Sequence, residues 1–218
     1  MTQNETSCSG WRLYVIVDRA AAGARALADL AAAAIRGGAD VIQLRDKTAS
    51  TRQLLQESAR VRAVTRDAGI PLIINDRADV VHAVGADGVH LGQDDLPIAA
   101  ARALLGPNRL IGQSTHSLEQ AIAAELEGAD YIGVGPIFST PTKPDAPSVG
   151  LDLIRAVIPR IEIPYVGIGG IDATTLQSVL SAGAERIAVV RAVCAAANPQ
   201  EAAERLKREL LARHPAIP

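Results

Sequence analysis

Two short apolar segments of the chain each end in carboxylates. Residues 72–76 read LIIND, and residues 89–95 read VHLGQDD. A run of large aliphatic residues is typical of a strand that is buried on both faces. If these segments are neighbouring parallel strands, about 4.8 Å apart, then Asp76, Asp94 and Asp95 lie at one edge of the sheet. The pattern therefore predicts a site where carboxylates meet around one cation.

Each carboxylate also has a simpler interpretation. Asp76 could cap the helix expected over residues 76–85, because an Asp at a helix start accepts a backbone hydrogen bond. Asp94 and Asp95 could lie in a solvated turn, or cap a helix in which Pro97 occupies the first turn. The spacing alone leaves both alternatives open.

Basic and amide groups follow another candidate strand, in the segment QLRDK at residues 43–47. Strand side chains alternate, so Gln43, Arg45 and Lys47 share one side. Two cations pointing into a barrel mouth are costly unless they meet an anion. Mg²⁺ held by carboxylates beside basic side chains is a common way to bind a diphosphate. The alternative is that these are surface charges beyond the end of the strand.

A hydroxyl and an imidazole follow a fifth candidate strand, in GQSTHS at residues 112–117. Ser114 and His116 share a side, and the Ser114 hydroxyl could donate to an anion. His116 could act as an acid or base, but His116 or Ser117 could equally cap the next helix. His90 is expected to pack inside the barrel rather than to bind a ligand.

Residues 135–150 read GPIFSTPTKPDAPSVG, and four prolines interrupt any helix or strand there. A loop of this length in a compact domain is usually functional or disordered. Its two threonines and one lysine, Thr140, Thr142 and Lys143, suit an anionic ligand. The alternative is a mobile surface loop without a role.

A glycine-rich turn, VGIGGID at residues 166–172, follows the seventh candidate strand. Backbone amides of Gly169 and Gly170, at the entry to a helix, would make an anion site. In (β/α)8 barrels a phosphate often lies after strands seven and eight. The alternative is that the glycines only permit a tight turn. With the site near residues 43–95, this predicts two phosphorylated substrates at one barrel mouth.

Short β-rich segments that alternate with Ala- and Leu-rich helical segments must position these groups. The expected strands are 12–17, 40–44, 71–75, 88–91, 110–114, 131–135, 164–169 and 186–190. The spellings GGADVI, VGADGV, EGADYI and AGAERI each stop a helix at Gly and start a strand. About 27 residues per unit predicts a single-domain (β/α)8 TIM barrel over residues 11–214, after a disordered tail at 1–10.

An open doubly wound sheet is the alternative fold, but no Gly-x-Gly-x-x-Gly follows the first strand and no Walker loop occurs. The net charge is −2 and aromatic residues make up 2% of the 218 residues, which disfavours nucleic acid and anionic membranes as partners. No apolar run approaches the roughly 18 residues of a membrane span. Cys8 and Cys194 form neither a metal spacing nor a disulfide framework, so a cytoplasmic location is expected.

The segments QLRDK, IIND, GVHLGQDD, GQSTHS, YIGVGPIFSTPTK and VGIGGI occur in an order and spacing that resemble the thiamine phosphate synthases. The resemblance extends from residue 11 to about 195. It implies a transferase of thiamine biosynthesis that joins hydroxymethylpyrimidine diphosphate to thiazole phosphate. Thiamine phosphate and pyrophosphate would be the products, and one Mg²⁺ per active site would assist. A homodimer is compatible with the sequence.

The resemblance also implies roles for individual residues. The two magnesium ligands would be Asp76 and Asp95, with Asp94 as a neighbour. The pyrimidine diphosphate contacts would be Gln43, Arg45, Lys47, Asn75, Ser114 and Lys143, of which Arg45, Ser114 and Lys143 would be catalytic. The thiazole phosphate contacts would be Thr140, Thr142, Gly170, Val190 and Arg191. Relatives have a small hydroxyl residue at the position of Arg191, so the chain departs from the family pattern there.

The implied reaction is a dissociative substitution that needs no protein nucleophile, which agrees with the lack of a Ser–His–Asp or reactive Cys set. Three other functions use the same kind of barrel. A thiazole tautomerase would use a His such as His116 and no diphosphate site. A regulatory barrel that senses thiamine phosphate would need the phosphate turns but no paired carboxylates. An enzyme acting on sugar phosphates would not need the second anion site.

Overall fold

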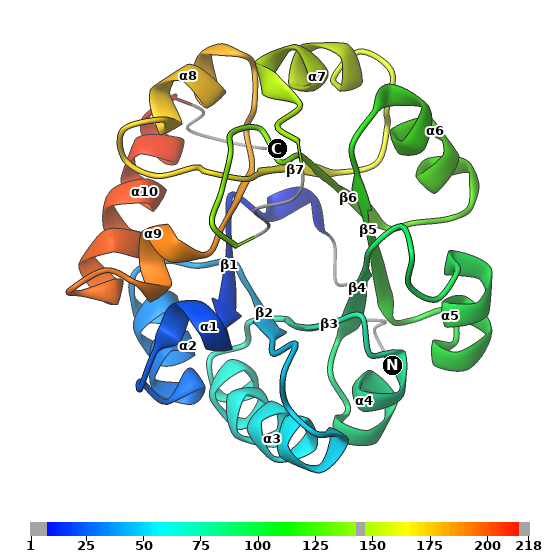
Figure 1. The fold of residues 1–218 in the computed structure, drawn as a ribbon, viewed down its shortest axis with the longest axis vertical. Coiled ribbons are helices and arrows are strands. Elements are labelled where there is room, and N and C mark those ends of the chain that lie inside the picture. Colours follow the sequence, from blue (N-terminus) through cyan, green and yellow to red (C-terminus); the bar gives the residue numbers. More distant parts are fainter. Residues whose placement is uncertain (1–7, 143–146, 214–218) are drawn as a thin grey trace.

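Eight strands pair in parallel, in chain order, and close into a barrel (Figure 1). The computed structural model describes residues 8–142 and 147–213. The strands are β1 Leu13–Asp18, β2 Val41–Arg45, β3 Leu72–Asn75, β4 Gly88–Leu91, β5 Leu110–Thr115, β6 Tyr131–Val134, β7 Tyr165–Ile168 and β8 Ile187–Val189. All eight predicted strands are confirmed, each end within one residue, and the open-sheet alternative is wrong.

Helices surround the barrel, between successive strands and after β8 (Figure 1). They are α1 Arg19–Ala22, α2 Leu27–Arg36, α3 Thr51–Asp67, α4 Ala78–Val84, α5 Ile98–Leu105, α6 Leu118–Leu126, α7 Gly150–Val157, α8 Leu176–Ser181, α9 Arg191–Cys194 and α10 Pro199–Arg213. Within the described ranges, no helix combines the length and the apolar character needed to cross a membrane.

The repeated GAD spelling has a structural role at the end of the barrel where the strands begin. Its Asp accepts a hydrogen bond from a backbone amide at the start of the preceding strand, and it also pairs with a Lys or Arg from a surrounding helix. The three Oδ2-to-amide contacts are Asp40 with Leu13 at 2.8 Å, Asp87 with Leu72 at 2.7 Å and Asp130 with Ile111 at 2.7 Å. Carboxylates at this end of a (β/α)8 barrel serve stability rather than catalysis.

Side-chain alternation divides the core into two layers. In β1, Leu13, Val15 and Val17 face the helices, whereas Tyr14 and Ile16 belong to a cluster inside the barrel. The same alternation in β2 turns Gln43 and Arg45 toward the inside, because Ile16 pairs with Gln43 in the parallel register. The inward positions of the strands therefore lead from an apolar floor to a polar mouth.

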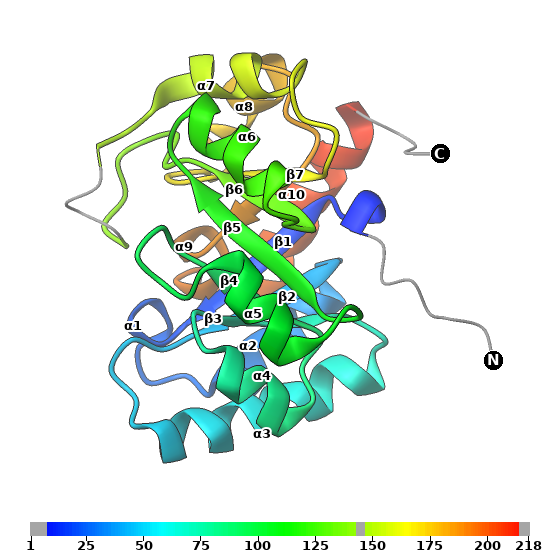
Figure 2. The same ribbon diagram turned by 90° about the vertical axis from the view of Figure 1, so that its right-hand side faces the viewer.

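A short N-terminal turn, η1 Cys8–Gly10, closes the floor of the barrel. Figure 2 shows this dark blue turn and the loop after β6 at opposite ends of the barrel. Cys8 and Trp11 are each 4% exposed and pack under Tyr14 and Tyr131. The predicted tail at 1–10 is therefore wrong for its last three residues, because this packing orders them, and residues 1–7 lie outside the described part of the chain.

Candidate active site

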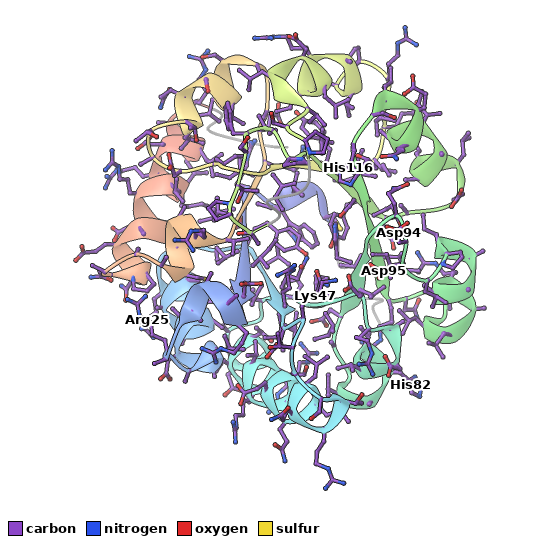
Figure 3. All side chains as sticks on the ribbon, in the orientation of Figure 1. Arg25, Lys47, His82, Asp94, Asp95 and His116 are labelled. Atoms are coloured by element: carbon purple, nitrogen blue, oxygen red, sulfur yellow. The ribbon has the colours of Figure 1, made fainter. Side chains whose placement is uncertain are left out.

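A cavity of about 390 Å³ opens at the carboxyl ends of the strands. Most of the predicted site residues line it, and they come from strands around the whole barrel. They are Gln43, Arg45, Asn75, Ser114, His116, Thr140, Thr142, Gly169, Gly170, Val190 and Arg191. Lys47, Asp76 and Asp95 do not line this cavity, and Lys143 lies outside the described residues. Figure 3 shows Lys47, Asp94, Asp95 and His116 near the mouth, with Arg25 and His82 farther out.

The carboxylates after β3 and β4 do come together. Asp76 forms an ion pair with Lys47 and a side-chain contact with Asp95. Burial raises the pKa of Asp76, the hydrogen bond with Asp95 raises it further, and Lys47 lowers it. Asp95 Oδ2 also accepts a 2.6 Å hydrogen bond from the Gly92 amide, which fixes its position. Asp94 is exposed. The result is a two-carboxylate cluster with one lysine as its counterion.

Backbone geometry argues against the capping alternative for Asp76. Helix α4 begins at Ala78, its N-cap is Arg77, and no side chain caps it. The Asp76 amide donates to the carbonyl of His90 at 2.8 Å, and its φ is 62°, in the left-handed region that non-glycine residues rarely occupy. Strain of this kind is found at functional sites. The capping alternative for Asp94 and Asp95 also fails, because no side chain caps α5 after Pro97. The turn alternative holds for Asp94, which is exposed in the turn after β4.

This donor set fits Mg²⁺ better than a transition metal. Within the described residues, no three His, Cys, Asp or Glu side chains converge as a metal-binding group. Mg²⁺ is usually bound through one or two carboxylates, with waters and substrate phosphates completing its shell. Asp76 and Asp95 match that requirement.

Arg45 is held by a residue that sequence reasoning missed. Its guanidinium pairs with Asp18, which is 2% exposed and ends β1. Asp18 also accepts a 2.9 Å hydrogen bond from the Ala21 amide and so caps α1. A carboxylate at the end of an apolar strand was the available signal, since LYVIVD ends in the same way as LIIND. Asp18 fixes the inward side chain of Arg45 at the mouth.

The glycine turn after β7 packs tightly against the start of the loop after β6. Gly169 and Gly170 have φ values of 100° and 63°. A Cβ would lie 2.5 Å from Pro136 Cα at the first position and 2.7 Å from Phe138 Cβ at the second. The turn therefore does require glycine, as the simpler alternative held. It also faces the cavity beside Val190 and Arg191, so the two interpretations are compatible.

The histidines divide between structure and site. Ser117, one of the two residues considered as a cap, caps α6 by accepting from the Gln120 amide at 3.2 Å. The Nδ1 atom of His116 hydrogen-bonds to the carbonyl of Gly135, while its ring lines the cavity. His90 is 8% exposed and packs inside the barrel, as predicted, and it also lines the cavity.

A chain of hydrogen bonds crosses the barrel interior, and sequence reasoning missed it. Gln43 Nε2 donates to the Tyr14 hydroxyl at 2.6 Å, and the hydroxyls of Tyr14 and Tyr131 are 3.0 Å apart. His90 then lies between Tyr131, at 3.1 Å from Nδ1, and Ser114, at 3.0 Å from Nε2. All five are inward strand positions, and polar residues in that alternation were the available signal.

Comparisons with known proteins give a consistent result. The family model described as thiamine monophosphate synthase matches residues 13–193. A thiamine-phosphate synthase of Chloroflexus aurantiacus is 52% identical over 198 residues, covering 90% of this chain and 91% of that protein. One from Natronomonas pharaonis is 45% identical, covering 89% and 92%.

Solved structures agree. A thiamine phosphate pyrophosphorylase from Pyrococcus furiosus superposes with a TM-score of 0.86 at 39% identity, covering 94% of this chain and 97% of that one. An N-acetylmannosamine-6-phosphate 2-epimerase from Clostridium perfringens has a TM-score of 0.63 at 20% identity, with 91% and 93% covered. The second likeness shows the fold alone.

Proposed function

The chain belongs to the thiamine monophosphate synthase family, and on that premise we propose that it joins hydroxymethylpyrimidine diphosphate to thiazole phosphate. Thiamine phosphate and pyrophosphate are the products. As a member of this family the chain is a transferase of thiamine biosynthesis that releases pyrophosphate. One observation carries the choice of substrates: a carboxylate–lysine–arginine cluster and a glycine turn lie on opposite sides of one barrel mouth.

The cluster side would take the pyrimidine diphosphate. Arg45 and Lys47 supply positive charge for the diphosphate, and each is already beside a carboxylate that keeps it in place. Gln43, Asn75 and Ser114 line the cavity next to them and can hydrogen-bond the pyrimidine ring and the phosphate oxygens. Asp76 and Asp95 would hold Mg²⁺, which when bound neutralises charge on the leaving diphosphate.

The glycine side would take the thiazole phosphate. Gly170, Val190 and Arg191 line this part of the cavity, and so do Thr140 and Thr142 of the loop after β6. Because Gly170 has no Cβ, a phosphate can approach its backbone closely. The two anionic groups then lie apart, with the reacting carbon and the thiazole nitrogen between them.

The proposed chemistry is dissociative. As the bond to the diphosphate breaks, positive charge develops on the pyrimidine methylene carbon, and the thiazole nitrogen attacks that carbon. Fixed cations such as Arg45 stabilise the departing anion without rearranging during the reaction. The thiols are unsuited as nucleophiles, because Cys8 and Cys194 are buried and neither lines the cavity. Burial also raises the pKa of Cys8 to about 12 and that of Cys194 to about 11.

The tautomerase is the second candidate, because His116 lines the cavity. A tautomerase acts on one thiazole phosphate and has no use for a diphosphate site. The paired carboxylates with Lys47 and the Asp18–Arg45 pair would then serve no substrate. The synthase uses both sides of the barrel mouth, so the geometry favours it.

A coupling assay tests the proposal directly. Purified protein receives both substrates, with and without Mg²⁺, and thiamine phosphate is measured by fluorescence after oxidation. We expect product that depends on Mg²⁺ and on both substrates. Folded protein that makes no product, but converts a thiazole phosphate tautomer alone, would establish the tautomerase instead.

Lys143 is proposed, from the family resemblance, as a diphosphate contact on the loop after β6. Lys143→Ala is expected to lower kcat by about tenfold and to leave the thiazole phosphate KM nearly unchanged, because a positive charge on the departing anion is lost. Steady-state kinetics with each substrate varied in turn measure both constants. Arg109→Ala, at the other end of the barrel before β5, is the control. Equal kcat in wild type and Lys143→Ala would remove the residue from the mechanism.

We also propose a cytoplasmic location and a homodimer. Both cysteines are free and buried, which suits a reducing compartment. Leu104 of α5 and Leu126 of α6 are 48% and 82% exposed, and a second copy could cover them. Sedimentation of Leu126→Lys against wild type tests the assembly, since a monomeric wild type would exclude it.

A further inference from the structure

The hydrogen-bonded chain inside the barrel links two residues that the proposed function assigns to the substrate. Gln43 lies at one end and Ser114 at the other, and both line the cavity. The residues between them, Tyr14, Tyr131 and His90, come from three different strands. Any function of these linked side chains therefore depends on which of them donates each hydrogen bond.

The Gln43 amide sets the direction of that arrangement. Its Nε2 donates to the Tyr14 hydroxyl, so the hydrogen of Tyr14 is available to Tyr131. If Tyr14 donates to Tyr131, the hydrogen of Tyr131 is directed to His90 Nδ1. With Nδ1 accepting, the ring proton would be on Nε2 and would donate to Ser114 Oγ. Burial raises the pKa of both tyrosines, so their hydroxyls stay protonated and continue to donate.

The surrounding packing is shaped to hold this arrangement. Gly112 leaves room for the Tyr131 ring, because a Cβ there would lie 2.1 Å from Tyr131 Cζ. A Cβ on Gly133 would lie 3.3 Å from His90 Cε1. Trp11 packs edge-on against Tyr131 with ring centroids 5.2 Å apart. The rings of Tyr131 and His90 therefore have little freedom to turn away from one another.

We propose that Tyr131 and His90 are positioning residues that turn the Ser114 hydroxyl into a hydrogen-bond donor aimed at the cavity. Ser114 Oγ accepts from His90, so its own hydrogen is left for an anionic oxygen of the substrate. Tyr14 positions Gln43 by accepting a hydrogen bond from its side-chain amide. The second amide hydrogen and the carbonyl oxygen of Gln43 are then left for a heteroaromatic ring. This inference rests on the proposed function only for the identity of the substrate.

A double-mutant cycle tests the coupling. Ser114→Ala should lower kcat/KM for the diphosphate by about tenfold, and Tyr131→Phe by several-fold, mainly through kcat. The double variant should be no slower than Ser114→Ala, because Tyr131 acts only through Ser114. Effects that multiply in the double variant would overturn the inference. Tyr165→Phe is the matched control, since the Tyr165 hydroxyl donates to the carbonyl of Gly183 at 3.0 Å and takes no part in the hydrogen bonds between Gln43 and Ser114.

A spectroscopic test works without turnover. ¹⁵N NMR of histidine-labelled wild type distinguishes a protonated ring nitrogen from an unprotonated one, and His90→Gln identifies the His90 signals among the four histidines. We expect the proton on Nε2 in wild type and a mixture of tautomers in Tyr131→Phe. A proton on Nδ1 in wild type would mean that His90 donates to Tyr131, which reverses the direction of the hydrogen bonds and overturns the inference. Wild type that fails the coupling assay would refute the synthase, while the NMR result would still decide this question.

Discussion

Asp95→Asn is expected to lower kcat/KM by about 100-fold and to raise the Mg²⁺ concentration needed for half-maximal rate. Asn has the shape of Asp and can still accept the Gly92 amide, so the turn after β4 keeps its geometry. What it removes is one negative charge beside Asp76. Initial rates across a Mg²⁺ titration measure the effect. Asp94→Asn is the matched control, because Asp94 is exposed and makes no contact with Asp76 that the structure shows.

The same variant has a pH signature. The pKa of Asp76 is raised, and Asp95 contributes to that through its hydrogen bond and its charge. Mg²⁺ needs the ionised carboxylate, so Mg²⁺ affinity in wild type falls as pH drops through this raised pKa. In Asp95→Asn the fall should occur at lower pH. An unchanged Mg²⁺ requirement at every pH would remove Asp95 from the metal site.

Gly170→Val is expected to raise the thiazole phosphate KM by roughly 10- to 100-fold, with a smaller change in kcat. At a φ of 63° a β-branched residue is strained, and its Cβ would lie 2.7 Å from Phe138 Cβ. The turn must shift, and its amides leave the position that a phosphate would need. Steady-state kinetics with the thiazole substrate varied give both constants.

Gly85→Val separates strain from site geometry. Gly85 ends α4 with a φ of 66°, but nothing lies within 4 Å of a Cβ placed there. Both variants carry the same backbone penalty, so both should lose thermal stability. Only Gly170→Val should change the KM. A KM that is the same in both would place the thiazole phosphate elsewhere.

Sequence periodicity was enough to predict the barrel, because each unit repeats the same local signals. The glycine that ends each helix and the apolar strand that follows it are signals carried by neighbouring residues alone. Eight such units in succession predict that the sheet closes into a barrel. Alternation along β2 and β5 also predicted correctly that Gln43, Arg45 and Ser114 face the mouth.

Contacts between distant strands could not be predicted in this way. Asp18 and Arg45 are 27 residues apart, and Tyr14 and Tyr131 are 117 apart. Such pairs form only when the barrel closes and brings inward positions of different strands together. The burial of Cys8 has the same origin, since the polar composition of residues 1–10 gives no sign that Cys8 packs against the barrel floor.

The packing of Trp11 has an optical consequence. It is the only tryptophan of the chain, it is 4% exposed, and it touches two of the three tyrosines. Light absorbed by Tyr14 or Tyr131 can pass to the indole over these short distances, so the emission of the protein comes mainly from one place. The emission maximum of Trp11 should lie at a short wavelength in the native state and move to a longer wavelength once water reaches the floor of the barrel. The protein therefore contains its own reporter of barrel closure.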